Sequence, residues 1–226
     1  MDYYDFGLCG GLVAAEIETT LFTCDETRQS DAPFDSRHVF CGIYGRKSKL
    51  KRGLYYLLGL SRAFGGALAA KHNIIHLHLF HVGILEFLTC AFARLLGFKL
   101  VATVHDVEAF AQGLSRETFE RCGYALAHRI IVHNRFSKQA LVRRYEALEP
   151  RISIIPHGNY LDAVPKLIDP LIGRERLGVT AEAQILLFFG QIKRVKGLDV
   201  LLDAMALVAE KHPRALLVIA GKVWKR

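Results

Sequence analysis

Residues 185–220 read ILLFFGQIKRVKGLDVLLDAMALVAEKHPRALLVIA, and this segment decides the fold. Its first five residues are all apolar and predict a buried strand, and residues 198–211 predict a helix that ends before Pro213. Residues 215–220 are apolar again and predict a second strand. A strand, a helix and a strand in this order are typical of a parallel sheet that helices cover on both faces.

The same alternation continues towards the N-terminus. Residues 2–15 predict a helix and 16–23 a strand, and Ser115 and Ser137 are the predicted N-terminal caps of two later helices. We therefore expect an α/β fold: a Rossmann-like parallel sheet, followed by the beginning of a second Rossmann-like domain. The remaining strands are predicted at 74–79, 99–104, 129–133 and 151–155, and the remaining helices at 82–96, 115–127 and 137–145.

The domain boundary is predicted in a stretch without strong periodicity, where three prolines lie between residues 156 and 170. We expect a first domain over residues 1–158, a linker with a short helix over 159–180, and a second domain over 181–226. The second domain is predicted to be incomplete, because two strands and one helix cannot complete a domain.

Composition excludes several classes of protein. Hydrophobic residues make up 51% of the chain and charged residues 23%, which excludes a disordered or collagen-like chain. The five cysteines are widely spaced and contain no CxxC, which argues against a disulfide scaffold and a zinc ribbon and favours a reducing compartment. The chain opens without a basic and apolar signal peptide, so we expect a cytoplasmic protein.

The net charge of +8 is unevenly distributed. Residues 1–36 hold eight acids and one base, a sum of −7, so the remaining residues carry +15. This basic body indicates an anionic partner, and charge alone leaves nucleic acid, nucleotide phosphate and an acidic membrane surface open. We expect no nucleic-acid partner, because neither a known module nor an interleaving of aromatic and basic residues accompanies the charge.

One apolar stretch raises the question of a membrane. Residues 53–70 read GLYYLLGLSRAFGGALAA, but the central Arg62 and four glycines argue against a membrane span. We expect a helix that is partly buried in the core or lies on a membrane surface. The five bases that precede it form either a solvated loop or a contact with anionic lipid. They are Arg46, Lys47, Lys49, Lys51 and Arg52.

Histidines follow several of the predicted strands, and ligands of open parallel sheets bind outside the carboxyl ends of the strands. The trio His76, His78 and His81 offers imidazoles that suit zinc, but no cysteine or acid is adjacent to complete a site, so we expect no metal. His105–Asp106 taken alone is typical of a turn. The residues at the strand ends are His78, His81, His105–Asp106, His133–Asn134 and His157–Gly158–Asn159.

A basic loop, residues 190–197 (GQIKRVKG), follows the apolar strand 185–189 and opens the next helix. Free backbone N–H groups and the helix dipole favour an anion at such a position, and three cations in four residues add charge for a diphosphate. The loop lacks the GxxxxGK[ST] pattern of a Walker A motif. The sequence favours phosphate binding over the alternative, a solvated basic turn.

Several segments together resemble a known family. The segments IIHLHLFH, KLVATVHD, RIIVHNRFSKQAL, ISIIPHGNY, ILLFFGQIKRVKGLDVLLDAM and ALLVIAGKVW are similar, in this order, to retaining glycosyltransferases of family 4, which have the GT-B fold. Enzymes of bacterial exopolysaccharide assembly are the most similar subgroup. The resemblance runs from about residue 74 to the C-terminus, and its most specific parts are the IPHG segment and the FG-x-I-x-x-x-KG loop.

The resemblance implies an acceptor-side first domain and a second domain that holds a nucleotide-sugar donor, without a metal or another cofactor. Lys196 matches the lysine on the donor diphosphate, Lys193 stands where the subgroup commonly has arginine, and Arg194 and Gly190 complete that loop. A cation there neutralises charge that develops on the leaving diphosphate. His105 matches the histidine that hydrogen-bonds the reacting hexose. In enzymes of this family, transfer takes place in a cleft between the two domains, and the resemblance implies that Asp106, His157 and Gly158 line it.

The chain departs from the family pattern at both ends. The family begins with a strand and a glycine-containing loop, whereas this chain opens on a predicted helix, and the donor-ribose glutamate motif does not follow residue 226. We expect a glycosyltransferase fragment that acts on a glycan or lipid-linked acceptor, with peripheral association at the inner face of the cell membrane. The alternative is a non-catalytic glycosyltransferase-like partner that docks to a complete transferase or a membrane. A dinucleotide-dependent oxidoreductase is disfavoured, because no GxGxxG follows a strand.

Overall fold

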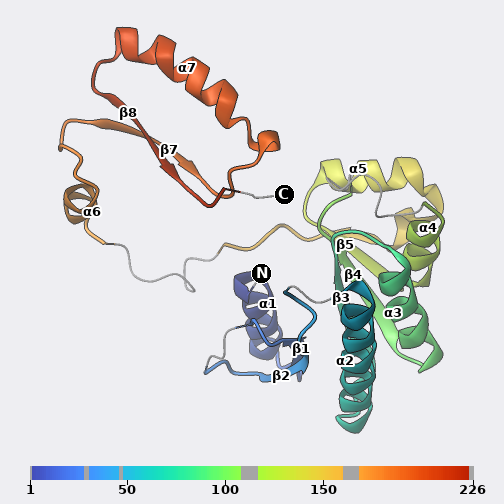
Figure 1. Cartoon of the computed structure of the whole chain (residues 1–226). Coiled ribbons are helices and arrows are strands. Elements are labelled where there is room, and N and C mark those ends of the chain that lie inside the picture. The colour runs from blue at the N-terminus through green and yellow to red at the C-terminus, as the bar shows by residue number, and fades with distance from the viewer. Residues whose placement is uncertain (1, 28–30, 46–47, 108–116, 160–167, 224–226) are drawn as a thin grey trace. The chain divides into compact units, whose positions relative to one another are not determined.

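The computed structural model describes residues 2–27, 31–45, 48–107, 117–159 and 168–223. The chain divides into two compact units, Met1–Val164 and Pro165–Arg226 (Figure 1). The predicted cap Ser115 lies outside the described residues, as do Arg46 and Lys47.

The first unit alternates strands and helices along the chain. Its helices are α1 (Asp2–Ala14), α2 (Lys49–Ala69), α3 (Ile84–Leu95), α4 (Glu117–Leu126) and α5 (Arg135–Arg144), followed by the 3-10 helix η1 (Glu146–Arg151). Its strands are β1 (Thr20–Cys24), β2 (Asp35–Phe40), β3 (Ile74–Leu79), β4 (Lys99–Val104), β5 (Arg129–Val132) and β6 (Ile152–Ile154).

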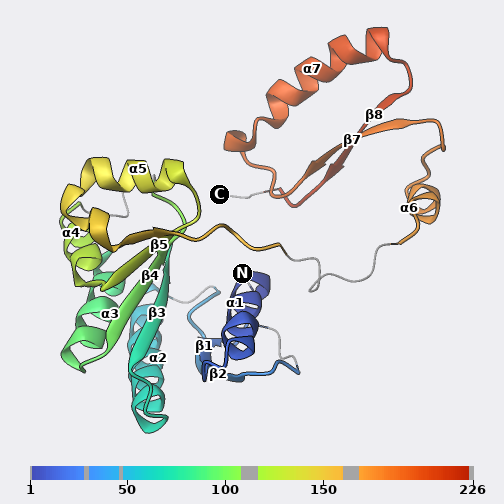
Figure 2. The ribbon, with the colours of Figure 1, turned by 180° about the vertical axis from the view of Figure 1, so that it is seen from behind.

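Four of these strands form one parallel sheet in the order β3-β4-β5-β6, which Figure 2 shows from behind. The parallel α/β architecture predicted from the sequence is therefore confirmed. The central strands β4 and β5 carry fully buried side chains, among them Leu100 and Ile130, because helices cover both faces of a sheet of this type. Leu141 of α5 is buried in the same core.

The strands β1 and β2 form a separate parallel pair, against which α2 packs. The contact depends on Gly59: a Cβ atom at this position would lie 2.9 Å from the carbonyl oxygen of Val39 and would also collide with the ring of Phe40. Gly66 likewise lies against the ring of Phe22. Two of the four glycines in the apolar stretch are thus explained by close packing of α2 on this pair of strands.

The partly buried helix predicted for residues 53–70 is present as the greater part of α2, since Leu60, Phe64 and Ala67 belong to the core. Among the described residues, no helix combines the length and the apolar character needed to cross a membrane.

Two local predictions are corrected by the structure. The N-cap of α5 is Asn134 rather than Ser137, because the Asn134 side chain accepts a hydrogen bond of 2.8 Å from the Ser137 N–H. The strand predicted from residue 16 begins only at Thr20. Glu16 has a φ of 61°, in the left-handed region in which helices commonly end, and so belongs to the turn that closes α1.

The second unit contains α6 (Pro170–Arg176), β7 (Gln184–Phe189), the 3-10 helix η2 (Arg194–Lys196), α7 (Leu198–Lys211) and β8 (Ala215–Ala220). The strands β7 and β8 pair in parallel over their full length. The sequence predicted that β7 is buried, and this is wrong for the chain as described: Phe189 is 82% exposed and Leu187 is 62% exposed. Two strands and the one long helix α7 cannot cover both faces of a sheet.

Candidate functional site

The carboxyl ends of the four strands in the first unit meet at one edge of the sheet. In the register of β3 and β4, Leu79 pairs with Val104, and the N–H of His105 donates to the Leu79 carbonyl at 2.9 Å. At the same end of the neighbouring pair β5 and β6, the N–H of Ile155 donates to the Val132 carbonyl at 2.9 Å. The residues that follow each strand are therefore held side by side.

Four histidines gather at or near this edge, and a fifth, His76, lies further back on β3. Together they form what we call the histidine cluster: His76, His78, His105, His133 and His157. Neighbouring rings are close, with centroid distances of 4.9 Å between His76 and His78, 5.3 Å between His78 and His105, 5.1 Å between His105 and His133, and 4.8 Å between His133 and His157. The repeated position of histidine at strand ends in the sequence therefore corresponds to a real cluster in space.

Hydrogen bonds fix several of these rings. His76 Nε2 lies 2.8 Å from the hydroxyl of the buried Thr103, and His78 Nδ1 lies 3.0 Å from His105 Nε2. The ring of His105 also stacks on Phe80, with a centroid distance of 4.6 Å and an angle of 9° between the planes. His105 is thus held between a neighbouring imidazole and an aromatic ring.

Three half-buried members of the cluster, His76, His78 and His105, are neutral at pH 7. Burial lowers the pKa of His76 to about 4. Burial, together with the neighbouring imidazoles, lowers the pKa of His78 to about 3 and that of His105 to about 4. Asp5 Oδ1 lies 4.0 Å from His78 Nδ1, but a neutral imidazole makes no ion pair with it. Neutral rings of this kind can donate, accept or ligate a cation.

The sequence did not single out Tyr4, which α1 places against the cluster. Its ring centroid lies 5.1 Å from that of His78, 5.0 Å from His105, 5.5 Å from His133 and 4.9 Å from His157. Tyr4 is twenty or more residues from any predicted site residue, and a tyrosine near the start of a helix carries no signal of its own. Only the packing of α1 reveals it.

The other predicted cleft residues lie at the same edge. Asp106 is half-buried and follows His105 directly, whereas His157 and Gly158 are exposed after β6. The trio His76, His78 and His81 does not form one group, because His81 Nε2 instead faces Glu86 Oε1 at 3.6 Å. Among the described residues, the group whose geometry could hold a metal ion is His105, His133 and His157.

In the second unit, the basic loop connects β7 to α7 as predicted. Gly190 and Gly197 have φ values of 127° and 65°, which favour glycine at both ends of the loop. The turn η2 is closed by a bond of 2.9 Å from the Lys196 N–H to the Lys193 carbonyl. Gly197 is the N-cap of α7 and has no side chain to cap the helix. The first α-helical hydrogen bond runs from the Leu201 N–H to the Gly197 carbonyl. The N–H groups of the first turn therefore have no acceptor within the helix.

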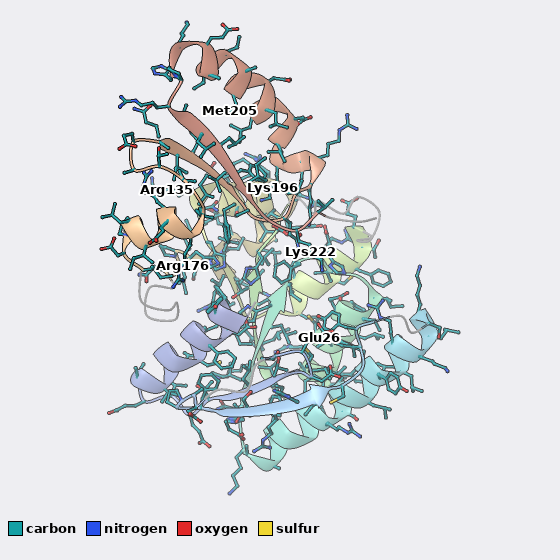
Figure 3. The ribbon with its side chains drawn as sticks, turned by 60° about the vertical axis from the view of Figure 1, so that its left-hand side comes forward. Glu26, Arg135, Arg176, Lys196, Met205 and Lys222 are labelled. Carbon is teal, nitrogen blue, oxygen red and sulfur yellow. The ribbon has the colours of Figure 1, made fainter. Side chains whose placement is uncertain are left out.

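Lys222 is a further cation that sequence analysis missed. It follows β8, and Figure 3 labels it together with Lys196 of the basic loop. Its carbonyl accepts a hydrogen bond of 3.0 Å from the N–H of Ile192, within that loop. Arg194 and Lys196 are exposed, and Lys193 is half-buried. The pairing of parallel strands thus adds Lys222 to a loop that already holds three cations, a surface that suits a diphosphate.

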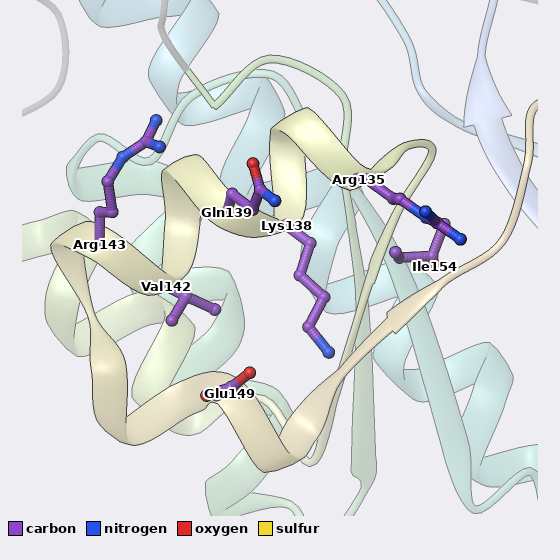
Figure 4. A pocket seen from close by; sticks show the side chains of 7 residues that line it. All are labelled: Arg135, Lys138, Gln139, Val142, Arg143, Glu149 and Ile154. Carbon is purple, nitrogen blue, oxygen red and sulfur yellow. The ribbon is translucent and has the colours of Figure 1, made fainter.

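A separate hollow of about 470 Å³ lies between α5, η1 and β6 in the first unit (Figure 4). Lys138 extends from α5 into it, and Glu149 of η1 lies at its opposite side (Figure 4). Because the hollow contains none of the predicted site residues and carries both signs of charge, it adds nothing to the assignment. Its lining residues are Arg135, Lys138, Gln139, Val142, Arg143, Glu149 and Ile154.

The sequence comparisons decide the family. The sequence profile of Glycosyltransferase Family 4 matches residues 6–162. The chain belongs to this family. The family 4 chain also matches the profile of Glycosyl transferases group 1 over residues 173–226. The resemblance inferred from the IPHG segment and the basic loop is thereby confirmed.

Curated relatives match nearly the whole family 4 chain. The D-inositol 3-phosphate glycosyltransferase of Streptomyces avermitilis is 29% identical in an alignment of 243 positions, gaps included, that covers 97% of this chain and 51% of that protein. The protein of the same name from Segniliparus rotundus is 29% identical in an alignment of 188 positions, gaps included, that covers 78% of this chain and 41% of that protein. The family 4 chain spans about half the length of the curated relatives it matches.

Solved structures show the same fold. Sucrose-phosphate synthase from Thermosynechococcus elongatus matches with a TM-score of 0.67 at 20% identity, and the match covers 94% of the family 4 chain and 54% of the synthase. HepE of Anabaena, in complex with UDP and glucose, matches with a TM-score of 0.59 at 16% identity, and the match covers 84% of the family 4 chain and 49% of HepE. At these identities the likeness concerns the fold, and it confirms the predicted Rossmann-like GT-B architecture.

Proposed function

We propose that this family 4 chain is part of a retaining glycosyltransferase, in which the second unit binds the diphosphate of a nucleotide-sugar and the first unit receives a glycan or lipid-linked acceptor. The anomeric carbon exchanges its bond to a diphosphate oxygen for a bond to an acceptor hydroxyl oxygen. The hydroxyl proton leaves with the nucleoside diphosphate. In this proposal the reaction uses no metal and no further cofactor.

The observation that carries the proposal is the basic loop at the N-terminus of α7. The N–H groups of the first turn, which have no acceptor within the helix, and the helix dipole attract an anion, and Lys193 and Lys196 supply point charges next to them. Negative charge grows on the diphosphate as its bond to the sugar breaks. Cations held there in advance stabilise the transition state more than the bound donor.

His105 is the residue proposed to contact the reacting hexose. Burial lowers its pKa to about 4, so at pH 7 it is a neutral hydrogen-bond partner for a sugar hydroxyl rather than a charged acid. The bond to His78 and the stacking on Phe80 limit the rotation of its ring. A fixed, neutral imidazole suits orientation of the sugar, which contributes to the rate through positioning.

Titration calorimetry with uridine, guanosine and adenosine diphosphate hexoses tests the donor assignment. We expect one of these donors to bind the chain, and the double variant Lys193→Ala/Lys196→Ala to weaken this binding by about a hundredfold or more, since charged hydrogen bonds contribute about 1.5 to 3 kcal/mol each. The control is Lys211→Ala/Arg214→Ala, which removes the same charge at the other end of α7. Equal losses of affinity in both variants would show that the overall positive charge, and not the basic loop, is responsible for donor binding.

A second candidate function is a non-catalytic partner that docks to a complete transferase or to a membrane at the cytoplasmic face. The observation in its favour is the surface of α2, where Leu50 is 88% exposed, Leu54 58% and Leu58 45%. Lys49 and Lys51 are exposed on the first turn of the same helix. Exposed leucines beside lysines are typical of a helix that contacts anionic lipid.

A further inference from the structure

Within the histidine cluster, His105, His133 and His157 differ from the rest in their mutual geometry. Each offers one ring nitrogen, and these three nitrogens lie within 4.8 Å of one another. They follow three consecutive strands, β4, β5 and β6, so the sheet brings them to one edge. We propose that these three histidines bind a divalent transition-metal ion, for which Zn²⁺ is the reference.

His133 gives the strongest independent support. Its Nδ1 lies 2.9 Å from the carbonyl oxygen of Ile155, so Nδ1 must carry the proton and donate it. The lone pair of the neutral ring is then on Nε2, which is buried and has no hydrogen-bond partner among the described residues. A buried acceptor without a partner is costly, and a metal ion in this place would satisfy it.

The outer hydrogen bonds of the other two histidines fit the same arrangement. His157 Nδ1 lies 3.2 Å from the carbonyl oxygen of Gly158, which leaves the lone pair on Nε2. His105 shares its Nε2 with His78 Nδ1, and when His105 is the donor its own Nδ1 carries the lone pair. Histidines that ligate metals usually donate their other ring N–H to a carbonyl or a side chain, which fixes the tautomer and the ring orientation.

The chemistry of the donor set indicates which ions fit. Three neutral imidazoles with a fourth position left for water are a known ligand set for zinc, and imidazole also suits copper and nickel. Nitrogens around a tetrahedral zinc ion lie about 3.3 Å apart, so the rings must close in on the ion. His157 is exposed in the segment after β6 and is the ring best able to move.

The proposed transfer reaction uses no metal, and the metal ion and the reacting hexose would compete for His105. The two are connected only through His105, because a nitrogen that ligates zinc cannot contact a hexose at the same time. The metal test measures binding alone, and the donor test measures nucleotide binding at the basic loop of the other unit. Failure of one test therefore leaves the other unaffected.

The experiment is a zinc titration of the chain without a polyhistidine tag, monitored by calorimetry. We expect one site per chain, weakened by roughly a hundredfold or more in His133→Ala and in His157→Ala, because even the loss of an outer partner of a ligand costs 10- to 100-fold. The matched control is His212→Ala, which removes an exposed histidine of the second unit and is expected to keep the site. Circular dichroism establishes that each variant is folded, and if His133→Ala is not, His157→Ala decides.

Cobalt distinguishes the ligands directly. The Co²⁺-loaded chain is expected to show visible d–d absorption without the intense near-ultraviolet band of thiolate ligation, although the chain has five free cysteines. A thiolate band would assign the ion to cysteine and overturn the proposal. So would zinc affinity that is absent, or that is unchanged in both His133→Ala and His157→Ala.

Discussion

His78 and His105 share a hydrogen bond of 3.0 Å between Nδ1 and Nε2, which a neutral pair can form and a doubly protonated pair cannot. Both rings sit at the carboxyl edge of the sheet, on the neighbouring strands β3 and β4 or directly after them. The protonation state of this edge therefore affects the stability of the first unit.

We predict that the free energy of unfolding falls as the pH drops from about 6.5 towards 4. Burial lowers the pKa of His76, His78 and His105 from 6.5 to about 4, 3 and 4, so below pH 6.5 the unfolded chain takes up protons before the folded one. Above pH 6.5 both states are neutral at these positions, and this contribution is constant. Urea unfolding at several pH values measures the effect.

The variant His78→Gln should flatten this pH dependence, since one of the titrating groups is removed. His212→Gln, on the exposed end of α7, should leave the pH dependence as it is. A slope that is identical in all three proteins would contradict the assignment to buried histidines.

We predict a loss of about 2 kcal/mol in unfolding free energy for Glu120→Gln. Glu120 is 5% exposed, and its Oε2 accepts bonds of 2.7 Å from Arg144 and 3.0 Å from the Tyr145 hydroxyl. Arg144 also donates to the Val107 carbonyl at 3.3 Å, so this network anchors the chain just after His105. Chemical denaturation measures the loss. Glu117→Gln, exposed on the same helix, is the control and should change stability by less than about 0.5 kcal/mol.

Two glycines of α2 should respond to alanine in opposite directions. Gly59→Ala should destabilise the first unit by about 1 to 2 kcal/mol, because its Cβ atom would press on Val39 and Phe40. Gly65→Ala should stabilise it by about 0.5 to 1 kcal/mol, because this exposed position has nothing within 4 Å and alanine is the better helix former. Thermal unfolding of both variants tests the pair, and a loss in both would mean that α2 packs differently.

We predict that the chain sediments with anionic vesicles and that salt weakens this binding. Each basic residue near an anionic surface contributes about 1 kcal/mol, so five give about 5 kcal/mol before screening. Replacement of Arg46, Lys47, Lys49, Lys51 and Arg52 by glutamine should abolish the binding.

The control for the vesicle experiment removes five bases elsewhere. Replacement of Arg135, Lys138, Arg143, Lys211 and Arg214 by glutamine gives the same net charge and should leave most of the binding. Equal sedimentation with neutral and anionic vesicles would rule out the electrostatic mechanism. Equal losses in the two variants would show that net charge is responsible, and not these five particular bases.

Apolar runs predicted most of the fold, and β2 shows where such runs are insufficient. Its sequence is DSRHVF, in which only the last two residues are apolar, so no strand was expected there. The strand forms because β1 supplies a parallel partner for each of its residues from Asp35 to His38. Pairing between segments is information that a local pattern does not contain.

The candidate site was predictable to the extent that it depends on strand ends. His105, His133 and His157 follow three apolar strands, and parallel strands bring their carboxyl ends together, so their proximity follows from the sequence. The contributions of Tyr4 and Lys222 do not, since each depends on how one element packs or pairs with another. The tautomer of His133 likewise depends on a contact between elements, because it is fixed by the carbonyl of Ile155, which follows β6.

The exposure of β7 has a consequence for local opening. Among residues 168–223 no side chain is buried, although the backbone bonds between β7 and β8 are complete. Hydrogen bonds without buried apolar contacts give little resistance to transient opening, whereas β4 and β5 are locked by side chains with almost no exposure. Amide protons of β7 and β8 should therefore exchange with deuterated water far sooner than those of Leu100 or Ile130. Binding of a donor to the basic loop should then be detected first as slower exchange in these two strands.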